Sequence, residues 1–199
     1  MKKITVTLTT VIFLTALVSC SKDKNNATAG VDITGTYKFI SLQAKTNSTV
    51  ESVSGSYITK TVTTSDYTSL NNAGTIKIDA NKFVTSNFSY SINSTAISTV
   101  YENGSVFDKF TFPFQATIPA TSGTWVYKRI SADSLYFDSG SVFIGSSAST
   151  PQPGGAKIKY VNGTLTMYGT AVKSTITKNQ DETVTNTASV VSVITLQKQ

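Results

Sequence analysis

The sequence predicts an all-β fold of antiparallel strands. Apolar and polar residues alternate with a period of two in short segments that recur along the chain, as in strands with one face on a core. Serine and threonine form about 30% of the chain, beside 9 tyrosines and 10 phenylalanines, and β-branched and aromatic side chains suit a pleated surface. After the N-terminal region, no segment shows the apolar period of a helix.

The first half of the chain contains five alternating segments. Residues 35–42 place Tyr37 and Phe39 on one face, and residues 83–92 do the same with Phe88 and Tyr90. Three further segments are expected to be strands, at residues 57–62, 75–79 and 96–101. Asn103-Gly104 follows the last of them. Both residue types tolerate the positive φ of a type I′ turn, so a hairpin is expected there.

The second half continues the pattern. Residues 107–114 carry Phe110, Phe112 and Phe114 on one face, and Pro113 has no backbone N–H to donate, which predicts an edge or bulged strand. A second Asn-Gly turn, at Asn162-Gly163, predicts a hairpin. The other strands are expected at 123–130, 134–138, 142–144, 157–161, 164–168, 171–177 and 184–196, with a flexible loop over 146–155.

These segments predict about nine to eleven antiparallel strands joined mostly by short turns. Sequential hairpins favour an up-and-down barrel, which closes its own edges, over a parallel sheet. A two-sheet β-sandwich is the alternative.

The N-terminus predicts secretion and a lipid anchor. Two lysines precede a mostly apolar stretch over residues 4–18 that is too short to span a bilayer. It ends in Leu17-Val18-Ser19-Cys20, which resembles the lipobox of bacterial lipoproteins, in which the thiol accepts a diacylglycerol. We therefore expect cleavage between Ser19 and Cys20, lipid attachment at Cys20, a flexible tether over 20–34 and one domain over 35–199. The alternative is a lone buried cysteine after an ordinary signal peptide.

Composition argues against several functions. The formal charge is +6, but Arg129 is the only arginine and the lysines are scattered, so nucleic-acid binding is not expected. The chain has no histidine, and Cys20 is its only cysteine, which removes the usual nucleophilic and zinc sites. The acids that could form a carboxylate pair or a calcium site lie near expected turns, where solvated acids are common: Glu102, Asp108, Asp133, Asp138, Asp181 and Glu182. We expect no catalysis, no cofactor and no metal.

Short motifs suggest a family. Gly35-Thr36-Tyr37 opens the first expected strand, Gly123-Thr124-Trp125 opens a later one, and Gly163 begins a Gly-Thr-Leu-Thr-Met-Tyr strand. This layout is similar to the lipocalin-like lipoproteins of Bacteroidetes over most of residues 33–199, although Tyr37 stands where the family has tryptophan. The chain also lacks a late arginine to stack on that aromatic, and no C-terminal helix is evident. The resemblance implies a lipocalin-like barrel anchored in the cell envelope, at the outer membrane on its periplasmic or cell-surface face.

The expected function is non-catalytic binding of a small hydrophobic or amphipathic ligand inside the barrel. The side chains expected to line it are Tyr37, Phe88, Tyr90, Phe110, Phe112, Trp125 and Tyr127. Trp125, Tyr127 and Arg129 share one side of a strand, which suits a sugar-stacking platform or, alternatively, core packing with one exposed cation. Asp133-Ser134-Leu135 resembles the O-glycosylation motif of secreted Bacteroidetes proteins, which makes Ser134 a candidate. The alternative function is a cell-surface structural or adhesion module that contacts proteins or glycans. The ligand, the membrane face and the oligomeric state stay open.

Overall fold

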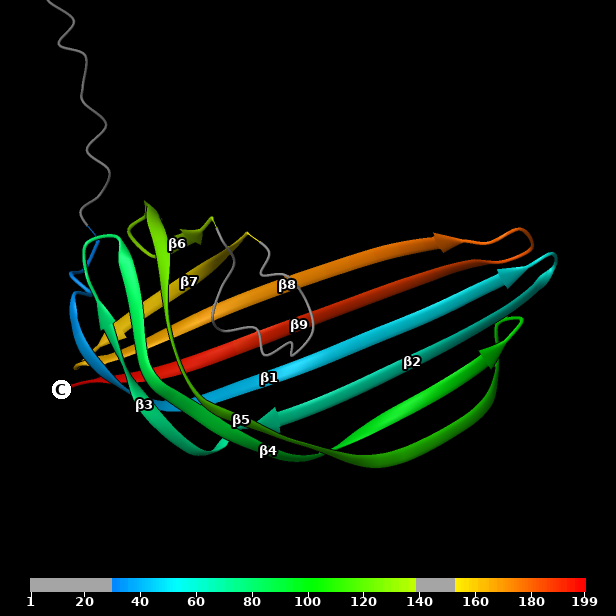
Figure 1. Cartoon of the computed structure of the whole chain (residues 1–199), viewed down its shortest axis with the longest axis horizontal. Helices are drawn as coiled ribbons and strands as arrows, with labels where there is room; N and C mark the ends of the chain where they lie inside the picture. Colours follow the sequence, from blue (N-terminus) through cyan, green and yellow to red (C-terminus); the bar gives the residue numbers. More distant parts are fainter. Residues whose placement is uncertain (1–29, 139–152) are drawn as a thin grey trace, which may run out of the picture.

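A computed structural model describes residues 30–138 and 153–199 (Figure 1). Every regular element in these ranges is a β-strand, and no helix in them is long and apolar enough to cross a membrane. The strands are β1 (Gly35–Ser54), β2 (Tyr57–Thr68), β3 (Leu70–Ile78), β4 (Lys82–Glu102), β5 (Ser105–Ser131), β6 (Ser134–Phe137), β7 (Gly154–Val161), β8 (Thr164–Lys178) and β9 (Thr183–Lys198).

The strands form one antiparallel sheet that closes in a ring. Each strand pairs with the next along most of the order, and β1 pairs with β9 to complete the circle. β2 and β3 share one position between β1 and β4, because the strand is interrupted at Ser69. Ser69 bridges the interruption: its backbone N–H donates to the carbonyl of Leu42, and its hydroxyl accepts from the Leu42 N–H, both at 2.8 Å. The up-and-down, barrel-like prediction is confirmed.

The ring is closed at only one end of the molecule. We call that end the closed body; it contains β3, β6, β7 and the adjoining halves of the long strands. The other halves project beyond it as a single-layer sheet, which we call the extension (Figure 1). The extension consists of residues 46–54, 57–65, 96–102, 105–112, 171–178 and 183–190. Its only buried residues are small: Ser65, Ala96 and Ser98.

Aromatic rings fill the closed body. Tyr37, Phe39, Phe83 and Phe137 are among its most buried side chains. The rings of Phe39 and Phe88 lie 4.4 Å apart between centroids, and those of Phe83 and Phe137 lie 5.4 Å apart in an edge-to-face arrangement. Such contacts add to the stability gained from apolar burial. The core therefore sits entirely at one end of the molecule.

The two Asn-Gly turns are as predicted. Asn103 and Gly104 have φ of 46° and 84°, and Asn162 and Gly163 have φ of 50° and 76°, the paired positive values of a type I′ turn. Pro113 lies in a stretch of β5 that pairs with β4 and with no other described strand, so its prediction as an edge residue is confirmed.

Several expected strands are parts of longer ones. Segments 83–92 and 96–101 are one strand, β4, and segments 107–114 and 123–130 are one strand, β5. Segments 164–168 and 171–177 likewise form β8, so the sheet has nine strands. Gly154 and Gly155 belong to β7 rather than to the expected loop. The segments at 1–29 and 142–144, including the predicted signal peptide, Ser19 and Cys20, lie outside the described residues.

Candidate functional site

The predicted ligand-lining residues separate into two groups. Tyr37, Phe88, Tyr90 and Tyr127 lie in the core of the closed body, each no more than 5% exposed. They contact one another or other rings, as in the edge-to-face pair of Phe88 and Tyr90 at 5.9 Å. The hydroxyl of Tyr37 donates to the carbonyl of Ile33 at 2.9 Å, and burial raises the pKa of Tyr37 far above that of a free tyrosine. These side chains pack against each other.

Phe110 and Phe112 lie outside this core. They belong to the extension, where their rings neighbour each other at 6.0 Å and remain 47% and 36% exposed. They were expected to line the barrel interior, but β4 is the one described strand that flanks this part of β5, so the two rings lie on the extension and not in the closed body. Phe114, two residues on, approaches the closed body and packs on Tyr67, with 5.7 Å between ring centroids.

The Trp125, Tyr127 and Arg129 series does not form a stacking platform. Tyr127 is buried and Trp125 packs on the core. The guanidinium of Arg129 donates to two backbone carbonyls, that of Val31 at 2.9 Å and that of Ala132 at 3.1 Å. Arg129 therefore fastens the chain just before β1 to the turn between β5 and β6. Core packing, the alternative expectation, is correct for Trp125 and Tyr127. Arg129 is not an exposed cation, because its guanidinium binds two backbone carbonyls.

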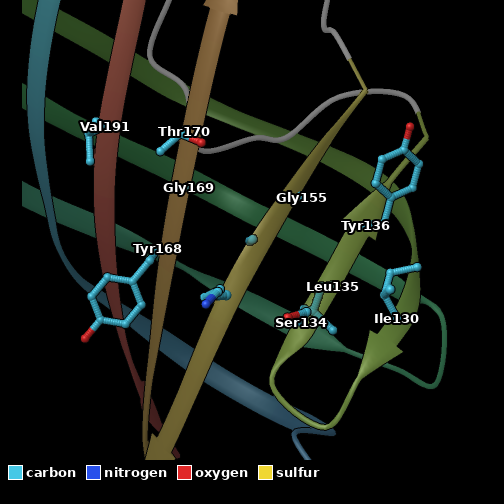
Figure 2. Close-up of a pocket in the computed structure, with 11 residues that line it drawn as sticks. Ile130, Ser134, Leu135, Tyr136, Gly155, Tyr168, Gly169, Thr170 and Val191 are labelled. Atoms are coloured by element: carbon cyan, nitrogen blue, oxygen red, sulfur yellow. The ribbon is translucent and has the colours of Figure 1, made fainter. Parts of the chain in front are cut away.

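A hollow of about 470 Å³ opens on the outer surface of the closed body, across β6, β7 and β8 (Figure 2). We call it the trough. Leu135 and Phe137 of β6 point into the core, so Tyr136 between them points outward; Tyr168 follows buried Met167 in β8 in the same way. Figure 2 shows the two tyrosines on either side of Gly155. The outward side chains around the trough are Ile130, Tyr136, Lys157, Tyr168, Thr170 and Val191.

Gly155 creates the floor of the trough. It pairs directly with Tyr136, and the next outward residue of β7, Lys157, pairs with Tyr168. A side chain at position 155 would stand between the two tyrosines. Its Cβ would meet only the Leu135 carbonyl oxygen, at 3.5 Å, which is ordinary van der Waals contact. The depth of the trough thus depends on the missing side chain of one residue.

The trough combines apolar faces with a few polar groups. Tyr136, Tyr168 and Val191 offer apolar surface, while Lys157 and Thr170 offer hydrogen-bond donors. Ser134 lies at its border, and its hydroxyl donates to Oδ1 of Asp133 at 3.0 Å. Two hydrogen bonds hold the pKa of Asp133 below its usual value; the one from Ser131 contributes most, and the one from Ser134 is next. This carboxylate is therefore ionised at neutral pH and accepts a hydrogen bond from the Ser134 hydroxyl.

The remaining acids do not converge. Within residues 30–138 and 153–199, no three acid, histidine or cysteine side chains are grouped to hold a metal. Asp138 forms an ion pair with Lys128 at 2.8 Å. Asp181 and Glu182 border a second hollow of about 430 Å³ at the turn between β8 and β9, where Glu182 accepts a hydrogen bond from Ser52.

Sequence reasoning missed the trough. Its signal was present in the alternation of Leu135-Tyr136-Phe137 and Met167-Tyr168, which places a large ring on the outer face of each strand. What the sequence does not show is that β6 and β8 flank β7 at the level of Gly155. No protein-family model, curated protein or solved structure matches the chain.

Proposed function

We propose that this protein is a non-catalytic, lipid-anchored binding module of the bacterial cell envelope, and that its ligand binds in the trough. The observation that carries the proposal is the contrast between the two sides of the same sheet. The inner side is filled with packed rings, whereas the outer side holds an open hollow between two tyrosines. A ligand inside the body would have to displace Tyr37, Phe88 and their neighbours; a ligand in the trough displaces only water.

The ligand class follows from the lining of the trough. Its volume is within the range of small-molecule sites, about 300–1,000 Å³. Tyrosine rings present an apolar face and a polar hydroxyl, which suits compounds that have both kinds of surface. Lys157 and Thr170 can donate to hydroxyl or carbonyl oxygens. We propose an amphipathic ring compound, such as one sugar unit of a glycan, stacked against Tyr136 or Tyr168.

The anchor supports the same function. The lipobox ending in Cys20 would hold the domain at a membrane, because two or more acyl chains anchor a protein stably. The trough lies on the outer surface, where an envelope glycan can reach it.

Ligand binding can be tested with the full-length protein in detergent on an array of neutral and acidic glycans. The decisive variant is Gly155→Val, which fills the trough with a β-branched side chain that strands accept. We expect at least about a tenfold loss of binding, equivalent to about 1.4 kcal/mol. Ser48→Val is the matched control, since Ser48 is an exposed residue of β1 in the extension, in a strand that is paired on both sides. Binding that Gly155→Val leaves unchanged would place the ligand elsewhere and contradict the proposal.

The anchor has its own test. Cys20→Ser removes the acylated thiol, so the protein is expected to move from the membrane fraction to the soluble fraction. Retention in the membrane fraction would contradict lipid attachment at Cys20. The trough variant is expected to leave this distribution unchanged, so the two parts of the proposal can fail separately.

A further inference from the structure

The extension has two strand edges with no described partner. Residues 105–113 of β5 pair with β4 on one side only, and residues 171–178 of β8 pair with β9 on one side only. Within the part of the chain that the structure describes, both edges therefore present backbone N–H and C=O groups without a strand partner, which are a template for pairing with another strand.

Exposed apolar side chains accompany both edges. Val106 on β5 and Ile176 on β8 are 62% and 63% exposed, and Phe110 and Val172 are also exposed. Proteins usually protect an edge with charges or proline, and Pro113 lies at the inner end of the β5 edge, where the extension meets the closed body. The outer part of that edge carries the large apolar residues Val106, Phe107 and Phe110 beside Asp108 and Lys109, and this mixture of apolar surface and charge suits an interface.

The two edges match each other row by row. A row is a line of directly paired residues that crosses the sheet from β5 to β8. Val106 and Ile176 lie in one row, which passes through Tyr101, Lys60, Glu51 and Thr185. Phe110 lies in the same row as Lys173, and Asp108 in the same row as Thr175. Side chains in one row lie on the same face of the sheet.

We propose that the β5 edge of one copy pairs antiparallel with the β8 edge of a second copy of this chain. In the register that keeps the rows aligned, Val106 faces Ile176 of the neighbouring copy. Lys173 then lies diagonally from Asp108 on the same face, within reach of a long side chain and with the opposite charge. Lys109 faces Ser174, so no like charges oppose each other in this register.

Strand direction selects this arrangement over a two-fold one. β5 runs from the tip of the extension toward the closed body, and β8 runs away from it (Figure 1). Antiparallel pairing of β5 with β8 therefore makes neighbouring copies point the same way. Pairing of β5 with β5 would put the closed bodies at opposite ends. The chain enters β1 at the closed body. Only the pairing of β5 with β8 therefore keeps all Cys20 anchors on one side, and this step rests on the proposed anchor. Repetition builds a ring or a row.

Cysteine cross-linking in membranes tests the pairing, because paired strand residues are close enough for a disulfide. Full-length protein with Val106→Cys and Ile176→Cys is oxidised and run under non-reducing conditions. We expect covalent dimers and larger species. A control with Val106→Cys and Val172→Cys, which is four residues out of register, is expected to stay monomeric. Co-expression of the two single variants is expected to link only unlike copies.

Three outcomes would overturn the proposal. The first is no cross-link in the matched pair; the second is a cross-link to a protein of another mass. The third is self-linking by Phe110→Cys alone, which indicates two-fold β5 pairing. Because acylation occupies Cys20, its thiol does not interfere. Membrane fractionation and glycan binding are measured on the same protein, so failure of the assembly is distinguishable from failure of the proposed function.

Discussion

Tyr37 connects the segment before β1 to the core. Its ring is fully buried, and its hydroxyl donates to the Ile33 carbonyl at 2.9 Å. Tyr37→Phe keeps the ring and removes the donor, which leaves a buried carbonyl unpaired. We expect the free energy of unfolding to fall by about 1–2 kcal/mol, measured by urea denaturation. Tyr168→Phe is the control, since its hydroxyl is on the outer surface. Equal stability of Tyr37→Phe and the parent would show that this bond contributes nothing.

Burial of Tyr90 makes the free energy of unfolding depend on pH in the alkaline range. Burial raises the pKa of Tyr90 to about 12, from 10.0. Between these values the unfolded chain has lost the proton that the folded chain keeps, so the unfolded state binds fewer protons. The stabilisation is therefore complete below pH 10 and is lost as the pH rises toward 12. Denaturation of the parent and Tyr90→Phe across pH 8–12 should show a smaller decrease in the variant. Parallel curves would refute this assignment.

At the scale of the element, paired irregularities shape β3 and β4. The register of β3 shifts around Gly74, which has φ of 100°, and β4 shifts between Thr85 and Phe88. A Cβ at Gly74 would lie 2.6 Å from the carbonyl oxygen of Asn87 and 2.7 Å from the Cα of Phe88. Only glycine fits this close approach of two backbones.

Gly74→Ala is consequently expected to destabilise the protein by about 1–3 kcal/mol, because it adds a clash to a strained φ. The melting temperature followed by circular dichroism measures the effect. Gly155→Ala is the matched control, because its Cβ has room and its φ is ordinary. A variant at Gly74 that melts with the parent would mean that β3 and β4 can separate at the bulge without cost.

Strand ends were the least predictable feature of the elements. The Asn-Gly turns and the core face of β4 follow from local chemistry, so Phe88 and Tyr90 were placed correctly inside. Residues 46–54 of β1 lack clear alternation, since neither face of the extension meets a core, and their strand structure comes from β2 and β9. Phe110 is the opposite case, in which the apolar alternation is regular but the residue does not lie in the core. The sequence does not show whether a second layer covers it.

At the scale of the whole molecule, stability is unevenly distributed. The long strands pass from a body with a packed aromatic core into a single layer without one. Apolar burial is the main favourable term in folding, so the extension depends on the strand ladder and on its continuity with the body. The trough lies on the closed body and the proposed contact between copies lies on the extension. The proposed ligand site and the proposed contact therefore use separate parts of the sheet.

Hydrogen exchange measured by mass spectrometry should reveal this division within a single strand. Amides of β1 in residues 36–44 are expected to exchange more slowly than those in residues 46–54, although residues 46–53 pair with both β2 and β9 and residues 39–42 have no ladder partner in β2 or β3. Local opening of the extension exposes little apolar surface, so it costs less than opening the body. The comparison uses dilute protein in detergent, where contacts between copies are minimal. Equal protection along β1 would mean that the single layer opens only with the core.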